Sequence, residues 1–163
     1  MLLRIDDRLI HGQVVAAWVR HLRTSRIVIV DDFTASDDMT RAVLEMVTPP
    51  DIELRVLSLN EAQDRIAGGG MLPEDMVLVK SPAAAASLIN AGLSVDRVNL
   101  GGLGAGPGRQ LLYRNVSISD EELRALQALM QRGVGVYWQA IPTDKPLDIR
   151  NTSLYRKKFG GGA

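Results

Sequence analysis

Short runs of valine, isoleucine and leucine alternate with amphipathic segments along almost the whole chain, and this alternation constrains the fold most strongly. The apolar runs predict strands buried on both faces, because a strand with one wet face would alternate apolar and polar residues. Predicted strands cover residues 2–5, 25–30, 52–57, 76–79, 97–100 and 134–141, and predicted helices cover residues 13–22, 36–47, 60–67, 83–91 and 120–131. This order favours a single α/β domain over residues 1–163, with a mostly parallel sheet and helices on both faces.

Helix ends are marked by residues that satisfy free backbone groups. Ser36 is placed to cap the second helix, and Ser119 with Glu122 forms a capping-box pattern at the last one. Gly92 and Gly133 stand where helices commonly end in a left-handed glycine. These signals support the predicted helix boundaries.

Glycine-rich stretches at residues 68–70 and 101–108 predict loops within the domain. The tail, residues 148–163, turns basic and ends in glycines and an alanine. Because such termini pack weakly, we expect this tail to be flexible.

Composition excludes several classes of function. Nineteen lysines and arginines balance nineteen acidic residues, whereas a dedicated nucleic-acid binder normally carries a basic excess. The absence of cysteine removes disulfides, thiolate nucleophiles and cysteine-based metal sites. No apolar run approaches the ~18 residues of a membrane-spanning helix, and acidic residues stand where a signal peptide would be apolar. We therefore expect a cytoplasmic protein without a nucleic-acid partner.

The residues best suited to chemistry lie between the first strand and the first helix, in Arg-Ile-Asp-Asp-Arg-Leu-Ile-His-Gly-Gln-Val over residues 4–14. Parallel α/β sheets bind ligands at such positions, beyond the carboxyl ends of their strands. His11 precedes the predicted helix and Gly12 permits an unusual turn. Gln13 opens the helix, whose free amides and dipole favour an anion. Arg8 carries a guanidinium that can fork onto phosphate oxygens.

One of two adjacent carboxylates, Asp6 and Asp7, is placed to orient Arg8 or His11, and the sequence leaves open which one does so. Together these groups would hold a phosphoryl group on an imidazole. The alternative is a hydrogen-bonded structural histidine, as a lone histidine near a strand end often is. The other histidine, His21, falls at the far end of the same predicted helix, and we expect it on the surface.

Further candidates follow other predicted strands, because a parallel sheet brings the loops after its strands to one edge. We expect them to line the same site or, alternatively, to be solvated loop residues. These lower-ranked candidates are Asp31, Asp32, Lys80, Ser81, Asn99, Gly101 and Gly102. Arg109 is predicted to face a partner, whereas Trp18 is predicted to pack in the core.

The loop over residues 4–14, followed by Trp18, closely resembles the N-terminal signature of a known family. The family is the IIB components of the mannose/fructose/sorbose type, which belong to the bacterial phosphoenolpyruvate-dependent sugar phosphotransferase system (PTS). Later blocks resemble the family in the same order, namely Arg26-Ile-Val-Ile-Val-Asp-Asp32, Thr48-Pro-Pro50, Lys80-Ser-Pro82, Asn99-Leu-Gly-Gly102 and Pro142-Thr-Asp144. The likeness extends along nearly the whole chain, although residues 103–108 are richer in glycine than the family pattern.

The resemblance implies a parallel-rich α/β fold and a phosphocarrier function. Family members take a phosphoryl group from a phosphohistidine of a IIA component and pass it to a sugar bound by membrane-embedded IIC and IID components. His11 matches the histidine that carries the phosphoryl group on Nδ1 in the family, and Arg8 matches the arginine that contacts it. Because a phosphohistidine already stores the energy of transfer, no cofactor or metal is expected. The chain also has no GxxxxGK[ST] motif.

We expect the partner surface to surround His11, with Arg4 and Arg8 offering a positive rim to an acidic face of the IIA component. The protein would then be peripherally associated with the membrane transporter. Two alternatives stay open from the sequence. They are a regulatory phosphocarrier without transport and a non-catalytic anion-binding module.

Overall fold

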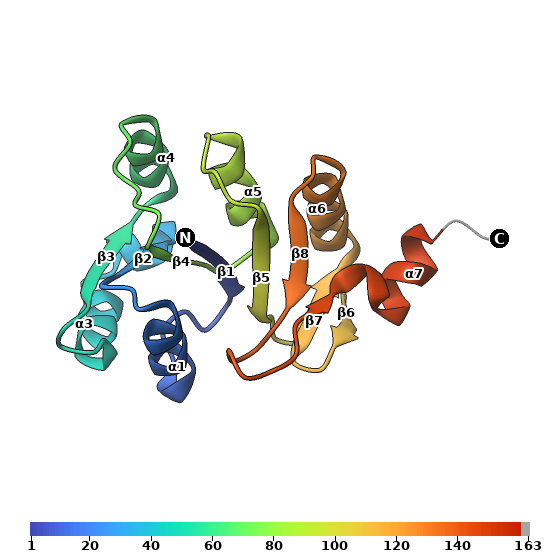
Figure 1. Cartoon of the computed structure of the whole chain (residues 1–163), viewed down its shortest axis with the longest axis horizontal. Helices are drawn as coiled ribbons and strands as arrows, with labels where there is room; N and C mark the ends of the chain where they lie inside the picture. The colour runs from blue at the N-terminus through green and yellow to red at the C-terminus, as the bar shows by residue number, and fades with distance from the viewer. Residues whose placement is uncertain (161–163) are drawn as a thin grey trace.

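The computed structural model describes residues 1–160, except for the side chains of Gln13 and Val14. A seven-stranded sheet forms its centre, in the strand order β3-β2-β4-β1-β5-β8-β9 (Figure 1). The strands are β1 (Leu2–Asp6), β2 (Arg26–Val30), β3 (Glu53–Leu57), β4 (Met76–Val79), β5 (Arg97–Gly102), β8 (Gly135–Trp138) and β9 (Leu147–Asp148). Pairings from β3 through β8 are parallel, and β9 runs antiparallel to β8. The expected mostly parallel sheet is confirmed.

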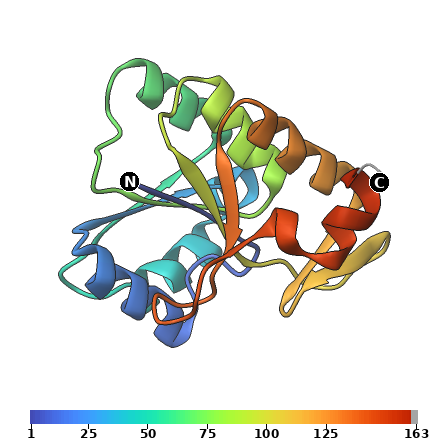
Figure 2. The same ribbon diagram turned by 45° about the vertical axis from the view of Figure 1, so that its right-hand side comes forward.

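Helices cover both faces of the sheet, as expected (Figure 2). On one face, α1 (Gly12–Leu22) and α3 (Asp38–Val47) share an apolar cluster with the strands. On the other face, α4 (Leu59–Ala67), α5 (Pro82–Asn90) and α6 (Asp120–Gln131) share a second cluster. Since successive strand residues point to opposite faces, strands between two clusters are apolar throughout. Among the described residues, no helix is long and apolar enough to cross a bilayer.

The segment after β2 differs from the single helix expected over residues 36–47. It forms two helices, α2 (Asp32–Ser36) and α3, and Ser36 ends the first helix instead of capping the second. The cap of α3 is Asp37, whose carboxylate accepts a hydrogen bond from the Thr40 amide at 2.9 Å. An ionised carboxylate also interacts favourably with the helix dipole, which explains why the aspartate caps α3 in place of the neighbouring serine.

Other predicted helix ends are confirmed. Ser119 and Glu122 form the capping box of α6, because each side chain accepts a hydrogen bond from the backbone amide of the other residue. Gly92 and Gly133 follow α5 and α6 with φ angles of +105° and +90°, a conformation that favours glycine.

A β-hairpin between β5 and α6 is absent from the sequence prediction. Its strands, β6 (Arg109–Tyr113) and β7 (Val116–Ser119), pair antiparallel, and Val116 bridges to Leu103 just beyond β5. Buried apolar residues alternate with two serines along β7, and this period of two could have indicated the strand. The hairpin therefore extends the fold at the carboxyl end of β5.

The tail carries secondary structure that the expectation of a flexible segment from Asp148 does not include. Its elements are β9, a short 3-10 helix (Ile149–Asn151) and α7 (Ser153–Phe159). Ile149 is fully buried in the core, and Thr152 caps α7 by accepting a hydrogen bond from the Tyr155 amide, so packing anchors this part of the tail. The last part of the expected flexible tail, residues 161–163, lies outside the described residues.

The strand order creates two places where neighbouring strands send the chain toward opposite edges of the sheet. From β1 the chain runs through α1 to β2, whereas from the adjacent β5 it runs through the hairpin and α6 to β8. From β2 it runs to β3, whereas from the adjacent β4 it runs to β5. Such switch points open crevices at the carboxyl ends of the strands, where ligands bind. They are named here the β1/β5 crevice and the β2/β4 crevice.

Candidate functional site

A single buried carboxylate organises the β1/β5 crevice. Asp6 ends β1 with no exposed surface, and its Oδ2 accepts a hydrogen bond from Arg4 Nη2 at 2.9 Å. Arg8 donates from Nε to Asp6 Oδ1 at 3.1 Å and from Nη2 to Oδ2 at 3.3 Å. His11 Nε2 lies 3.8 Å from the same Oδ2. The structure thus brings together the residues that the sequence ranks highest.

His11 is the capping residue of α1, and Gly12 follows it with a φ of +43°. The imidazole makes no capping hydrogen bond, and no acidic residue occupies the first turn, so no charge within the helix compensates the dipole of α1. Nδ1 of the ring lies 3.2 Å from the carbonyl oxygen of Leu9. Nε2 is buried and has no hydrogen-bond partner among the described residues.

The turn before His11 is strained at Leu9. Its φ of +55° is a left-handed conformation that an L-residue with a bulky side chain rarely adopts. Its side chain is buried in the cluster beneath α1, and its amide donates to the Asp6 carbonyl at 3.0 Å. Packing of the Leu9 side chain therefore stabilises the strained backbone, and this backbone conformation directs the Leu9 carbonyl toward the imidazole.

Arg4 lies far from the exposed rim where the sequence places it. It is 1% exposed and sits inside the sheet. Its Nη1 donates to Asn99 Oδ1 at 2.6 Å and to the Gln139 carbonyl at 3.1 Å. Burial lowers the pKa of the guanidinium, and the Asp6 carboxylate counteracts this shift. The sequence contained one indication of this burial, because Arg4 stands within a strand predicted to be buried on both faces.

The candidates at the end of β5 accommodate the two arginines. Asn99 is fully buried and anchors Arg4. A Cβ at Gly101 would lie 2.1 Å from Arg4 Cζ. A Cβ at Gly102 would lie 2.7 Å from Arg8 Nη2. Because a side chain at either position would collide with a guanidinium, these glycines let both arginines reach the shared carboxylate.

The second carboxylate of the loop, Asp7, faces another direction. It accepts a hydrogen bond from the Gly104 amide at 2.7 Å and lies 3.7 Å from Arg109 Nη1. Arg109 donates to both carboxylate oxygens of Glu122, at 3.1 and 2.6 Å, and this hydrogen bonding raises the pKa of Arg109. The charge of Arg109 is thus compensated internally, and its partner-facing role stays a prediction. Of the two adjacent acids, Asp6 is the one within the cluster.

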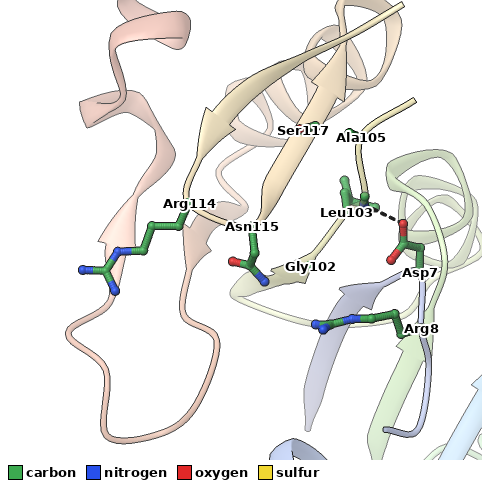
Figure 3. A pocket seen from close by; sticks show the side chains of 9 residues that line it. Asp7, Arg8, Gly102, Leu103, Ala105, Arg114, Asn115 and Ser117 are labelled. Atoms are coloured by element: carbon green, nitrogen blue, oxygen red, sulfur yellow. Dashed lines mark hydrogen bonds between the residues drawn. The ribbon is translucent and has the colours of Figure 1, made fainter. Parts of the chain in front are cut away.

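A pocket of about 360 Å³ opens beside this cluster (Figure 3). It is lined by Asp7, Arg8, Gly102, Leu103, Gly104, Ala105, Arg114, Asn115 and Ser117. Arg8 and Asn115 extend toward each other across it, whereas Arg114 points away (Figure 3). Asn115 donates to the Gly101 carbonyl at 2.7 Å and accepts from Trp138 Nε1 at 2.9 Å. The unpredicted hairpin therefore supplies one wall of the pocket.

Asp31 and Lys80 meet in the β2/β4 crevice. Lys80 Nζ donates to Asp31 Oδ2 at 2.8 Å, and the same oxygen accepts from the amide and the hydroxyl of Thr34 at 2.9 and 2.6 Å. Burial alone would raise the pKa of Asp31, but hydrogen bonds from Lys80 and Thr34 outweigh it, and the pKa is lowered.

The other candidates in this crevice serve helix starts. Ser81 caps α5 by accepting a hydrogen bond from the Ala84 amide at 3.2 Å. Asp32 accepts from the Leu59 amide at 2.7 Å, where α4 begins. A pocket of about 290 Å³ lies here. Within the described part of the chain, no hydrogen bond or ion pair joins these residues to the Asp6 cluster, so the structure does not bring them together with His11.

The remaining expectations concern α1. Trp18 is 3% exposed and donates from Nε1 to the Ala140 carbonyl at 2.9 Å, which confirms its place in the core. His21 is exposed, as expected. Gln13 lies in the first turn, but its side chain is outside the described residues. Across residues 1–160, no group of three histidine or acidic side chains could hold a metal ion.

Two guanidiniums around one carboxylate leave a positive charge beside an imidazole and a helix N-terminus. Such an arrangement favours a dianion held next to the ring, as a phosphoryl group on an imidazole nitrogen would be.

Comparison with known proteins agrees with this geometry. The profile of the family described as "PTS system sorbose subfamily IIB component" matches residues 1–160. The N-acetylgalactosamine-specific phosphotransferase enzyme IIB component 2 of Escherichia coli (strain K12) is 30% identical over 149 residues, which are 91% of this chain and 95% of that protein. The PTS system fructose-specific EIIB component of Bacillus subtilis (strain 168) is 29% identical over 91% of this chain and 92% of its own length.

A solved structure shares the fold. The IIBSor domain of the sorbose permease from Klebsiella pneumoniae superimposes with a TM-score of 0.84 at 26% sequence identity. The match covers 99% of this chain and 96% of that domain. By its sequence over residues 1–160 and by its fold, the chain belongs to the sorbose subfamily of PTS IIB components.

Proposed function

We propose that this chain accepts a phosphoryl group on His11 from a phosphohistidine of a IIA component and passes it to a sugar held by membrane IIC and IID components. It works from the cytoplasmic side, as a peripheral partner of the transporter. The observation that carries the proposal is the cluster of Asp6, Arg8 and His11 at the N-terminus of α1.

Nδ1 of His11 is the nitrogen that takes the phosphoryl group in this proposal. Nε2 is buried and faces Asp6, so an approaching phosphorus atom has no access to it. With the proton on Nε2, the lone pair of Nδ1 forms the new N–P bond while the N–P bond of the donor imidazole breaks. The donor ring leaves with the electron pair of that bond. The contact between Nδ1 and the Leu9 carbonyl opens in this step.

Stabilisation of the transferring group comes from charges already in place. Arg8 is held on Asp6 by two side-chain hydrogen bonds, yet its side chain is 51% exposed, so it also faces an incoming group. The uncompensated dipole of α1 points at the same loop. Preorganised donors of this kind lower the barrier because they need no rearrangement during the reaction.

The first test is phosphorylation by the complete upstream chain. The protein is mixed with phosphoenolpyruvate, Enzyme I, HPr and a mannose-family IIA component whose competence is shown on a known IIB protein. Intact mass should show one acid-labile phosphoryl adduct, absent in His11→Ala. His21→Ala is the matched control and should be phosphorylated normally, because His21 is exposed at the other end of α1. No adduct on the wild-type protein would contradict the proposal and favour an anion-binding module.

The second test addresses the sugar. Relatives are named for N-acetylgalactosamine, fructose and sorbose, so these sugars form the first panel. Phosphorylated protein is added to membranes that contain the cognate IIC and IID components, and sugar phosphate is measured. One sugar should discharge the adduct. An adduct that persists with every sugar in competent membranes would favour a regulatory phosphocarrier.

A further inference from the structure

Arg4 lies beneath the site and is shielded from solvent and partners. Its guanidinium is held by the Asp6 carboxylate, the Asn99 amide oxygen, the Gln139 carbonyl and the Trp18 ring, whose centre is 5.5 Å from Cζ. Burying a charge carries a large desolvation cost, and an apolar side chain of similar volume would often make the core equally or more stable. The position therefore calls for an explanation beyond packing.

We infer that Arg4 is a positioning residue for phosphoryl transfer. It holds Oδ2 of Asp6 toward Nε2 of His11, which keeps the imidazole proton on Nε2 and leaves Nδ1 free to attack phosphorus. This inference rests on the proposed function and adds to it a residue that touches neither the phosphoryl group nor the partner.

The two nitrogens of His11 face competing acceptors. The Leu9 carbonyl oxygen, 3.2 Å from Nδ1, favours a proton on Nδ1, and that tautomer has no lone pair for attack. Asp6 Oδ2, 3.8 Å from Nε2, favours a proton on Nε2, which is the attacking tautomer. The position of one carboxylate oxygen thus decides between an inactive and an active ring.

Arg8 alone does not fix that oxygen. Its side-chain hydrogen bonds are shared between both oxygens of Asp6, and its guanidinium is half exposed, so solvent and an incoming phosphoryl group compete for its donors. Arg4 binds Oδ2 at 2.9 Å and is itself anchored by Asn99. Arg4, which is buried, therefore fixes this oxygen more firmly than the half-exposed Arg8 does.

Arg26 offers a matched control at the opposite end of the sheet. It begins β2, is 7% exposed, and donates from Nε and Nη2 to the two oxygens of the fully buried Asp75, at 2.7 and 2.6 Å. Both pairs join a strand arginine to a buried aspartate. Within the described part of the chain, no hydrogen bond or ion pair joins Asp75 to a histidine, so we expect loss of Arg26 to weaken the fold without acting on His11.

The experiment compares Arg4→Met and Arg26→Met in the full chain, with phospho-IIA as the varied substrate. For Arg4→Met, kcat should fall ~10- to 100-fold, which is the usual effect of losing a group that orients a metal-bound histidine from behind. KM for phospho-IIA should stay within about twofold, because a buried residue does not bind the partner. Arg26→Met should keep both constants.

The tautomer of His11 gives a readout that does not need phosphoryl transfer. ¹⁵N NMR of the imidazole is recorded at alkaline pH, where imidazoles are neutral, with His21→Gln to assign the signals. The wild-type protein and Arg26→Met should show Nε2–H. Arg4→Met should shift toward Nδ1–H.

Wild-type kcat together with the wild-type tautomer in Arg4→Met would overturn the inference, and so would an equal loss of kcat in Arg26→Met. If Arg4→Met does not fold, Gly101→Ala replaces it, because its Cβ would displace the guanidinium while keeping the charge. Gly101→Ala should lower kcat and shift the tautomer in the same way, and wild-type values would again overturn the inference. Failure of the proposed function is visible separately, as a wild-type protein without an adduct.

Discussion

The two crevices lie at the same edge of one sheet and are built from the same kinds of residue, yet their charges are arranged differently. In the β2/β4 crevice, Asp31 and Lys80 compensate each other, and Asp31 also caps α2. In the β1/β5 crevice, one carboxylate serves two guanidiniums, and the helix that follows has no side-chain cap. The one-to-one ion pair of Asp31 and Lys80 is neutral and stabilises the fold. The carboxylate of Asp6, which is shared by two guanidiniums, leaves one positive charge available to a ligand.

The largest difference should appear when each aspartate is neutralised. Asp6→Asn leaves a buried arginine without its partner and should reduce the free energy of unfolding by about 3–5 kcal/mol. Asp31→Asn should cost about 1 kcal/mol, because asparagine can still cap α2. Urea denaturation monitored by circular dichroism measures both. An equal loss of unfolding free energy in the two variants would mean that the two carboxylates contribute equally to stability, which would contradict the comparison.

Removing the more exposed cation of each crevice, Arg8 or Lys80, should separate an effect on phosphoryl transfer from an effect on stability. Arg8→Ala should lower kcat/KM for phosphorylation by roughly 10²–10³, the usual effect of losing one preorganised donor. Its unfolding free energy should change by no more than about 0.5 kcal/mol, because the side chain is half exposed. Lys80→Ala should phosphorylate within about twofold of wild type. A large loss in Lys80→Ala would show that the β2/β4 crevice takes part in transfer.

A smaller effect is expected from crowding Arg8 without removing it. Gly102→Ala places a Cβ 2.7 Å from Arg8 Nη2, so the guanidinium must shift. We expect a loss of roughly tenfold in kcat/KM, since misplacing a reactive group weakens transfer. Gly106→Ala is the control, because the nearest atom to its Cβ would be 3.9 Å away. Unchanged transfer in Gly102→Ala would show that phosphoryl transfer tolerates a displaced Arg8 guanidinium.

The smallest effect concerns pH. Because the folded state lowers the pKa of Asp31, its contribution to stability is complete above the ordinary value of about 3.9 and is lost as the pH falls through the lowered value. The difference in unfolding free energy between wild type and Asp31→Asn should therefore be constant from pH 7 to about 5 and shrink below about 4. Urea denaturation at each pH tests this. A difference that grows in acid would contradict it.

The sequence predicts the sheet, most helices and the loop that carries His11, because apolar periodicity and loop position are local properties. It places Arg4 wrongly, since burial of a charge depends on partners such as Asn99 and Gln139, which lie 95 and 135 residues away. The order of strands, which no local pattern encodes, also decides that Asp31 and Lys80 form a separate crevice.

The hairpin and the tail escaped prediction for a different reason. Arg114, in the turn between β6 and β7, has a φ of +44°, where a glycine or an asparagine would have been the expected turn signal. The tail looked unstructured because it is basic and ends in glycines, yet one residue, Ile149, anchors it in the core. The hairpin thus lacks a local turn signal, whereas in the tail tertiary packing overrides composition.

The position of β1 at the centre of the sheet has a consequence for how the protein is made. Strand β1 pairs with β4 and β5, and the hydrogen bonds of its arginine are completed only by Gln139, which is synthesised 135 residues later. Contacts so distant along the chain form late in folding. We therefore expect the buried arrangement of Arg4 and Asp6 behind the histidine loop to be completed only after Gln139 has been synthesised. Under the proposed function, we therefore expect an unfinished chain to be a poor acceptor, and the capacity to carry a phosphoryl group to arise together with the completed fold.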